Sequence, residues 1–474
     1  MTKNKTHSQK KGKQIHSYSY KISQEKVSSF GGLALGERLA SGLGFWSDLQ
    51  KHLCARRGKY CRIDIIRGAV NGLLSGSRGT AILNQLGEDE PLLNVLGIKE
   101  LPGEKIFWEE LKRLGSDELK DGFSKGLSDW AVKLLKRTHE DELFNQHGLV
   151  PLFGDGTLLE GSSKREGTKT IPSKGVGLMW SNWFVGPVMA TQHLSGAQEG
   201  EKKGLMDKLD ILLEDVIDKL GWRSRSLVLM DSLHGDGPTL DRLEQEKLYY
   251  TVGANKLTSA QKVMNELPES VWTEVPSTSR RADCVSEQTC VASVQCEDWP
   301  QKRLLVCKRF KRDGDLFWKT ISVMTNLPAA RLQKSSQSSP VFAQEIWALY
   351  ASKMGLEDYF KDALIDLSGH RPPCNGLFAN RGDYALLSLA YNLERGIDLL
   401  GGLALREQKR QEAKDRGHKQ MPSQRMRLWN LRRQLFMLPA RIIVHARKAT
   451  ITLLGGGKSY LVLFEQYWDA IVQC

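Results

Sequence analysis

The chain has 474 residues, of which 40% are hydrophobic and 26% charged, and its formal net charge is +13. A chain of this length is too long to fold around a single ordinary hydrophobic core, so two or three domains are expected. No apolar run reaches the length of a membrane span, and the N-terminus carries no hydrophobic signal core, which predicts a cytoplasmic protein rather than a membrane-spanning or secreted one. The positive charge favours a polyanionic partner.

The eight cysteines carry no metal signature. None forms a close Cys-x-x-Cys pair, and the six-residue steps between Cys284, Cys290 and Cys296 are not a usual zinc spacing. We interpret them as reduced structural thiols.

The N-terminal third is predicted to be helical. Residues 1–22 are polar and basic, and form a disordered arm that either touches nucleic-acid phosphates or is a simple solvated tail. Residues 23–147 show apolar side chains at helical steps, as in Ile63, Ile66 and Val70. We expect a helical DNA-binding domain here. A basic patch in it either faces DNA or is a solvated helix face: Arg56, Arg57, Lys59, Arg62 and Arg67.

Two short apolar runs that each lead into an aspartate mark the next segment, residues 148–255. Leu149–Phe153 precedes Asp155, and Ser226–Met230 precedes Asp231. Both runs read as buried strands, and the segments between and after them alternate between strand and helix patterns. This alternation predicts an α/β sheet, in which ligands collect where strand ends meet loops.

Residues 256–330 break this alternation, because short strand patterns follow one another with polar turns between them. We predict a β-rich insertion there. The α/β domain would then have two parts, residues 148–255 before the insertion and residues 331–400 after it.

One long amphipathic helix is predicted at Val341–Ser368. Beside its apolar face runs a second stripe at steps of three and four residues, formed by Tyr350, Lys353, Glu357 and Lys361. The stripe places a carboxylate between two cations, next to a phenol. A solvated helix face with weak ion pairs has the same pattern, so the stripe alone does not identify a site.

The C-terminal region, residues 401–474, is basic. Between Arg406 and Lys448 there are 13 Lys or Arg residues and three acids. A hairpin is expected around Gly455–Gly457. The stretch Gly455–Ser459 resembles a phosphate-binding loop, but Thr452 stands where such a loop needs its first glycine, so the hairpin turn is the better interpretation.

Three carboxylates are the candidates for chemistry: Asp155, Asp231 and Glu357. Two acids at strand ends and one on a later helix can converge on one side of a sheet. Because three close carboxylates repel one another, they need a cation, and an all-oxygen ligand set suits Mg²⁺ or Mn²⁺. Two such ions could activate an attacking hydroxyl and stabilise a leaving phosphate oxygen. Tyr350, Lys353 and Lys361 would hold the nucleic-acid backbone nearby.

Two other arrangements of polar residues compete with this set. Glu394 is a competing third acid, but its own helix lacks a matching basic stripe. Asp231, Ser232 and His234 contain the residue types of a hydrolase triad, but residues so close along the chain rarely form one, and no nucleophile elbow is present.

The ordered set of motifs resembles the DDE transposases, and within them the insertion-sequence-four-like group. The helix of that group carries Tyr-x-x-Arg-x-x-x-Glu followed by a lysine, and this chain has Tyr350-x-x-Lys353-x-x-x-Glu357 with Lys361 after it. One branch of the group also shares three further motifs: Phe378-Ala379-Asn380, Leu389-Ala390-Tyr391-Asn392-Leu393 and Pro439-Ala440-Arg441-Ile442. The resemblance covers roughly residues 30–450.

The resemblance implies a ribonuclease H-like fold with a mixed sheet and a β-rich insertion before the glutamate. It also implies a catalytic and metal-binding set of Asp155, Asp231 and Glu357. It implies a metal-dependent transposase that cuts and joins DNA at the ends of an insertion sequence, acting as a homodimer near the prokaryotic nucleoid. Two departures stand out: Lys353 replaces the arginine, and Leu364 stands where many relatives have the lysine. A transposase-derived DNA-binding protein without activity, and a metal-dependent nuclease without strand transfer, remain alternatives.

Overall fold

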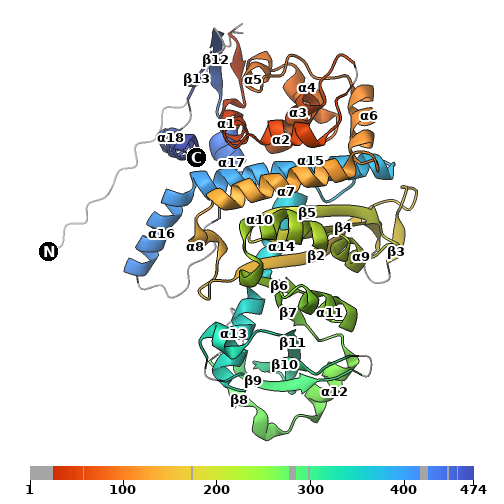
Figure 1. Cartoon of the computed structure of the whole chain (residues 1–474). Helices are drawn as coiled ribbons and strands as arrows, with labels where there is room; N and C mark the ends of the chain where they lie inside the picture. The colour runs from red at the N-terminus through yellow and green to blue at the C-terminus, as the bar shows by residue number, and fades with distance from the viewer. Residues whose placement is uncertain are drawn as a thin grey trace, which may run out of the picture.

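The computed structural model describes residues 25–56, 58–171, 175–276, 284–296, 299–334, 336–416, 425–445, 448–455 and 457–473. The N-terminal arm expected at residues 1–22 lies outside this part. The described chain is a mixed α/β structure whose largest element is a ten-stranded sheet. Figure 1 shows the sheet in the lower half and most of the N-terminal helices above it, with the long helices α7 and α15 crossing between them. No helix in the described residues is long and apolar enough to cross a membrane.

Helices dominate the chain from Ala34 to Leu143, where apolar residues at helical spacing predicted them. The longest, α7 (Lys120–Arg137), buries Phe123, Leu127 and Trp130 along one face. The other helices here are α1 (Ala34–Gly42), α2 (Phe45–His52), α3 (Arg62–Ser75), α4 (Ala81–Gly87), α5 (Glu90–Val95), α6 (Glu104–Leu114) and α8 (Glu140–Leu143).

The sheet is mixed, as the sequence predicted. Its first half has the strand order β5–β4–β2–β6–β7, in which β5, β4 and β2 are antiparallel neighbours and β2, β6 and β7 are parallel. The bounds are β2 (Val150–Glu160), β4 (Gly175–Val185), β5 (Val188–Gly196), β6 (Ser226–Met230) and β7 (Tyr249–Gly253), with the short β3 (Lys169–Ile171) on the edge beside β4.

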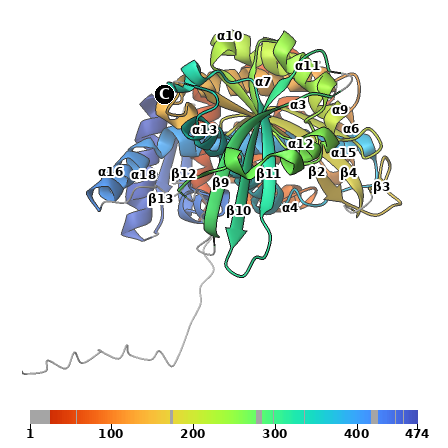
Figure 2. The same cartoon turned by 90° about the horizontal axis from the view of Figure 1, so that it is seen from below.

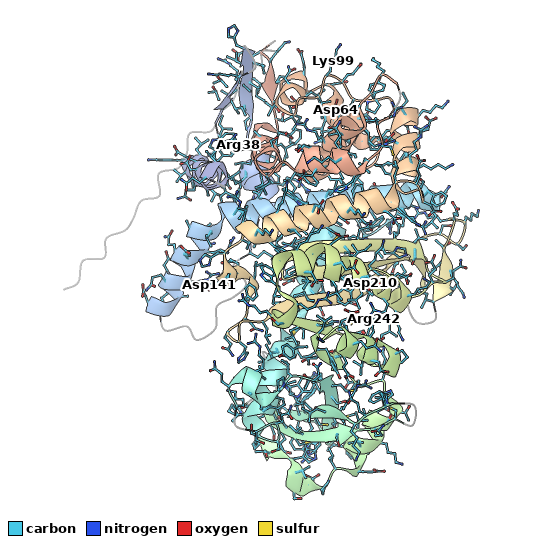
Figure 3. All side chains as sticks on the ribbon, in the orientation of Figure 1. Arg38, Asp64, Lys99, Asp141, Asp210 and Arg242 are labelled. Atoms are coloured by element: carbon cyan, nitrogen blue, oxygen red, sulfur yellow. The ribbon has the colours of Figure 1, made fainter. Side chains whose placement is uncertain are left out.

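Helices between these strands cover the sheet. They are α9 (Glu201–Met206), the π-helical η2 (Ile211–Ile217), α10 (Asp218–Leu220) and α11 (Gly237–Gln245). An ion pair of 2.5 Å between Arg242 of α11 and Asp210 before η2 ties two of these segments together, and both side chains are labelled in Figure 3.

The strands of residues 273–325 continue the same sheet, because β11 pairs antiparallel with β7. From β7 the order runs β11–β10–β9–β8. The bounds are β8 (Thr273–Glu274), β9 (Cys284–Val294), β10 (Arg303–Arg312) and β11 (Lys319–Thr325), with α12 (Thr258–Glu266) before them. The division into an insertion and a flanking domain stays a prediction.

The helix predicted at Val341–Ser368 is broken, so the prediction of one continuous helix is wrong. The structure has α13 (Pro340–Ala351), α14 (Met354–Lys361) and the π-helical η6 (Asp362–Asp366). The turn between α13 and α14 lies at Ser352 and Lys353, where the Ser352 hydroxyl donates to the carbonyl of Leu349 at 2.6 Å. A serine that bonds back to the preceding turn competes with the regular helix pattern, which explains the break at this position.

Helix α14 lies on the sheet face formed by β2 and β4. The Tyr359 ring contacts Phe153 at 6.1 Å and Phe184 at 5.7 Å, and the Phe360 ring contacts Trp180 at 5.9 Å. Because side chains two residues apart on a strand share a face, Asp155 lies on the same face as Phe153, under the α13–α14 junction.

The C-terminal part packs on the buried helix α15 (Leu377–Gly396) and its π-helical continuation η7 (Ile397–Gly401). It contains α16 (Leu403–Asp415), α17 (Leu428–Leu431), η8 (Arg432–Phe436) and α18 (Lys458–Gln473). A small sheet joins β1 (Val27–Ser28), β12 (Ala440–His445) and β13 (Lys448–Leu453). The hairpin predicted around Gly455–Gly457 is therefore wrong: it closes earlier, between β12 and β13. Residues 458–473 form a helix instead, since Phe464, Tyr467 and Ile471 are buried at helical spacing.

Candidate active site

Asp155 and Asp231 lie level with each other on neighbouring parallel strands. Phe153 of β2 pairs with Leu229 of β6, so the same register two residues later brings Asp155 beside Asp231. Adjacent strands are about 4.8 Å apart, which places the two carboxylates within reach of a shared ligand. Asp231 directly follows β6, as predicted, whereas β2 continues past Asp155 to Glu160, so Asp155 is a mid-strand residue and not a strand-end one.

Backbone amides orient both carboxylates. The N–H of Gly156 donates to Asp155 Oδ1 at 2.9 Å, and the N–H of Leu233 donates to Asp231 Oδ1 at 2.8 Å. The buried imidazole of His234 lies behind the second acid, with Nε2 3.8 Å from Asp231 Oδ1. These contacts limit the rotation of each side chain and so fix where its remaining oxygen points.

Lys353 reaches the first aspartate from the turn between α13 and α14. Its Nζ lies 3.2 Å from Asp155 Oδ2, and its side chain is only 16% exposed. The break in the helix therefore places an ammonium group against the carboxylate, in the position where a cation would compensate its charge.

Tyr350 approaches the second aspartate. Its hydroxyl packs against Gly253 of β7, where an added Cβ would lie 2.8 Å from it and 2.8 Å from the amide nitrogen of Ser232. Burial raises the pKa of Tyr350 to about 12, and the negative charges of Asp231 and Asp155 add to that effect. Two members of the predicted stripe thus lie at the aspartates: Lys353 pairs with Asp155, and Tyr350 lies near Asp231.

Glu357 lies on the exposed side of α14, away from this pair. It lines a cavity of about 530 Å³ together with Lys361 and several arginines: Arg395, Arg406, Arg410 and Arg425. Lys361 pairs with Asp358 at 3.3 Å. Within the described ranges no three His, Cys, Asp or Glu side chains gather as a metal site would need, so Glu357 does not complete a cluster with Asp155 and Asp231 in this geometry.

Asn182 is a polar residue at this site that the sequence did not reveal. It stands directly opposite Asp155 on β4, and opposite residues of an antiparallel pair point to the same face. The residue is fully buried, yet neither its amide nitrogen nor its amide oxygen has a hydrogen-bond partner among the described residues. An unsatisfied buried amide beside two carboxylates fits an oxygen-rich site for a hard cation and its waters. Only the strand register could have identified it.

The competing acid, Glu394, is fully buried and bonded to the adjacent Arg395 at 2.8 Å. Burial raises the pKa of Glu394 to about 8, despite the opposing effect of Arg395. Asp362 and Asp398 bind the same guanidinium group, so Glu394 belongs to a buried ion cluster between η6, α15 and η7.

Much of the basic surface expected from the sequence is compensated inside the fold. In the N-terminal patch, Arg56 and Arg62 both bind Glu110, and Arg67 binds Glu37. In the C-terminal region, Arg406 and Arg410 bind Glu142, and two further arginines bind acids of η6: Arg425 to Asp362 and Arg427 to Asp366.

The chain is similar to a known protein family and to a solved structure. Residues 188–471 match the family model described as transposase DDE domain group 1. The matched segment contains Asp231 and Glu357 and begins after Asp155. No curated protein matches the chain. A cryo-EM structure of a piggyBac transposase synaptic complex with hairpin DNA matches with 12% identity over 95% of this chain and 85% of that chain, at a TM-score of 0.37.

Proposed function

The chain belongs to the transposase DDE domain group 1 family, and from this premise we propose that it performs metal-dependent DNA cleavage and strand transfer in cut-and-paste transposition. Its substrates would be the ends of an insertion sequence and a target DNA. The observation that carries the proposal is the pair Asp155 and Asp231, level on neighbouring parallel strands and approached by Tyr350 and Lys353.

Asp155 and Asp231 would hold one or two Mg²⁺ or Mn²⁺ ions, with the Asn182 amide available to a bound water. A hard divalent ion supplies charge stabilisation for the attacking and leaving oxygens of a phosphodiester. The residues themselves fix the carboxylate directions through the amides of Gly156 and Leu233.

Glu357 is proposed as the third acid. It lies one helical turn after Lys353 on the sheet-covering helix α14, so a modest shift of α14 at the Ser352–Lys353 turn would exchange the ammonium for the carboxylate beside Asp155. Tyr350, Lys353 and Lys361 would then bind the DNA backbone around the cut.

We also propose the finer family assignment: the insertion-sequence-four-like group, with strands β5–β4–β2–β6–β7 as the ribonuclease H-like core. An antiparallel meander followed by parallel strands, with an acid on each of the central strands β2 and β6, supports this assignment. The proposal includes DNA binding by residues 23–147, an insertion at 256–330, a homodimer on DNA and a nucleoid location.

The test is cleavage of a plasmid that carries the coding region with its own flanking DNA. Purified protein with Mg²⁺ or Mn²⁺ should release the element and join it to a second plasmid, and chelation of the metal should stop both steps. Cleavage without joining would identify the nuclease alternative.

A second candidate is a DNA-binding protein of this family without catalysis. The position of Glu357 among cations, away from the two aspartates, is the observation that favours it. DNA binding without any metal-dependent cleavage would select this candidate.

A further inference from the structure

The hairpin that joins β10 to β11 ends in an unusually exposed apolar pair. Leu316 is 82% exposed and Phe317 is 81% exposed, and in the part of the chain that the structure describes no other large hydrophobic side chain is as open to solvent. Figure 2 shows this loop projecting from the body of the molecule. Exposed neighbouring apolar side chains on a projecting loop mark an interaction surface.

The turn that carries the pair is held in shape. Asp315 accepts a hydrogen bond from the Arg312 N–H at 3.0 Å and pairs with Lys319 at 3.0 Å. Just inside the turn, Trp318 packs under Arg309 at 4.6 Å and Lys311 at 5.4 Å. Leu316 and Phe317 are thus presented by an ordered turn, which lowers the entropic cost of binding through them.

The hairpin leaves the sheet at the edge where the aspartates lie. Asp231 is level with Gly253 of β7, and Gly253 pairs with Val323 of β11. Since β11 is antiparallel to β7 and begins at Lys319, it runs four residues, about 13 Å, beyond the level of the acids before the turn starts. DNA positioned with a phosphate at Asp155 and Asp231 would therefore lie within reach of the turn.

The charge of the hairpin suits DNA. Residues 308–319 contain five basic side chains and two acidic ones, and the strand part reads Lys308-Arg309-Phe310-Lys311-Arg312. Apolar side chains such as Leu and Phe, flanked by cations, are the groups that proteins wedge between base steps of duplex DNA.

We propose that the β10–β11 hairpin is a DNA-contacting arm whose Leu316 and Phe317 insert into a base step beside the scissile phosphate. This inference rests on the proposed function for the placement of the duplex. The length of the hairpin would fix the distance between the bound DNA and the acids. The arm would hold the DNA through stacking and apolar contact rather than through base recognition.

Photocrosslinking with the full chain tests the contact directly. Benzoylphenylalanine replaces Phe317 in one protein and Val341 in the control, since Val341 is also exposed, at 50%, but lies in the first turn of α13, at the end of that helix away from Tyr350 and the aspartates. With a radiolabelled duplex from the flank of the coding region, position 317 should crosslink to DNA and position 341 should not. No crosslink at 317, or a crosslink to a second copy of the chain, overturns the proposal.

Binding constants separate insertion from simple proximity. Leu316→Ser combined with Phe317→Ser should weaken duplex binding at least about fivefold, because stacking is lost. The salt slope, which is the slope of the logarithm of the binding constant against the logarithm of the salt concentration, should be unchanged, because the phosphate contacts remain. Lys311→Ala should instead reduce the slope by about one. Wild-type affinity in the double serine variant overturns insertion.

The outcome is independent of catalysis. If the wild type cuts DNA but position 317 does not crosslink, the arm is wrong and the proposed function stands. If position 317 crosslinks and the wild type does not cut, the arm stands and the cleavage function fails.

Discussion

Both aspartates are oriented by backbone amides, and they give a prediction at the scale of single residues. Asp155→Asn and Asp231→Asn each keep the shape of the side chain and remove its charge. Each should lower cleavage by at least about a hundredfold, since the proposed metal site would lose a ligand, while DNA binding is retained. Glu357→Gln should do the same if α14 delivers the third acid. Plasmid cleavage and filter binding measure the two effects, and a variant that cuts at the wild-type rate is excluded from the catalytic set.

Lys353 gives a second prediction, because it contacts Asp155 in the protein without DNA. Lys353→Ala should weaken binding of element ends and reduce the salt slope by about one, if the side chain moves to a phosphate when DNA is bound. Lys353→Arg introduces the arginine of the insertion-sequence-four-like helix that this stretch resembles, together with its forked donor, so it should preserve or raise cleavage. An alanine variant that binds and cuts like the wild type at several salt concentrations shows that Lys353 only compensates Asp155.

Asn182 gives a third prediction, in which stability and activity move in opposite directions. Asn182→Leu replaces an unsatisfied buried amide by an apolar group of similar volume, so the free energy of unfolding without metal should rise by about 1–3 kcal/mol. Mn²⁺ affinity and cleavage should both fall. Denaturant unfolding and metal titration measure the two quantities, and a decrease in stability would show that the amide has a structural partner.

At the scale of elements, the sequence predicted the strands of the sheet well and the helix over the site less well. The apolar runs at Val150–Phe153 and Ser226–Met230 are strands because fully buried parallel strands need such runs. The break at Ser352 depends on a hydroxyl that bonds to Leu349, which helical periodicity does not detect. The same break moved Lys353 onto Asp155, so the sequence identified the stripe but not its contacts.

The ion cluster between η6 and α15 gives a pH prediction. Burial raises the pKa of Glu394 to about 8 from an ordinary value near 4.5, so the native state holds this proton more tightly than the unfolded chain. The proton on Glu394 therefore adds to the free energy of unfolding. This contribution is complete below pH 4.5 and is lost as the pH rises to about 8, by no more than about 1.4 kcal/mol per pH unit. Asp362 and Asp398 share Arg395 and also have raised pKa values from burial.

Glu394→Gln is the matched test, because the amide cannot titrate. Between pH 5 and 8 the free energy of unfolding of the wild type should fall relative to that of the variant. Urea unfolding at several pH values measures the difference. Parallel pH curves for the two proteins would mean that Glu394 is ionised throughout this range.

At the scale of the whole molecule, net charge was a poor guide to the charged surfaces. The sequence places 13 Lys or Arg residues between Arg406 and Lys448, and the structure uses several of them as internal partners of acids distant in the chain. Ion pairs such as that of Arg406 with Glu142 join residues far apart in sequence, so no local count could have found them. The exposed apolar pair Leu316 and Phe317 was likewise hidden, because exposure is a property of the folded chain.

The last prediction follows from this internal use of charge: the C-terminal region is part of the folded core and not a separable basic module. Arg432 is buried, and its guanidinium donates to the carbonyls of Leu74 at 2.8 Å and Asp366 at 2.9 Å, joining α3 to η6. A chain that ends at Leu400 would keep Arg395 but lose this arginine and three others that pair with acids of the core: Arg425 with Asp362, Arg427 with Asp366 and Arg406 with Asp398. Breaking buried ion pairs costs about 3–5 kcal/mol each, a large part of the 5–15 kcal/mol that holds a typical domain together. We therefore expect the shortened chain to lack a cooperative thermal transition.

A single substitution tests, without shortening the chain, whether the C-terminal region is part of the folded core. Arg432→Met deletes the buried guanidinium and leaves the carbonyls of Leu74 and Asp366 without their donor, so it should lower the free energy of unfolding by at least about 2 kcal/mol. Arg433→Met is the matched control, because Arg433 is the next residue in the same π-helical segment and is exposed, so its loss should change stability by no more than about 0.5 kcal/mol. Urea unfolding of both variants measures the difference. Equal stability of the two variants, or a cooperative transition in the chain ending at Leu400, would mean that residues 401–473 dock on a core that folds without them.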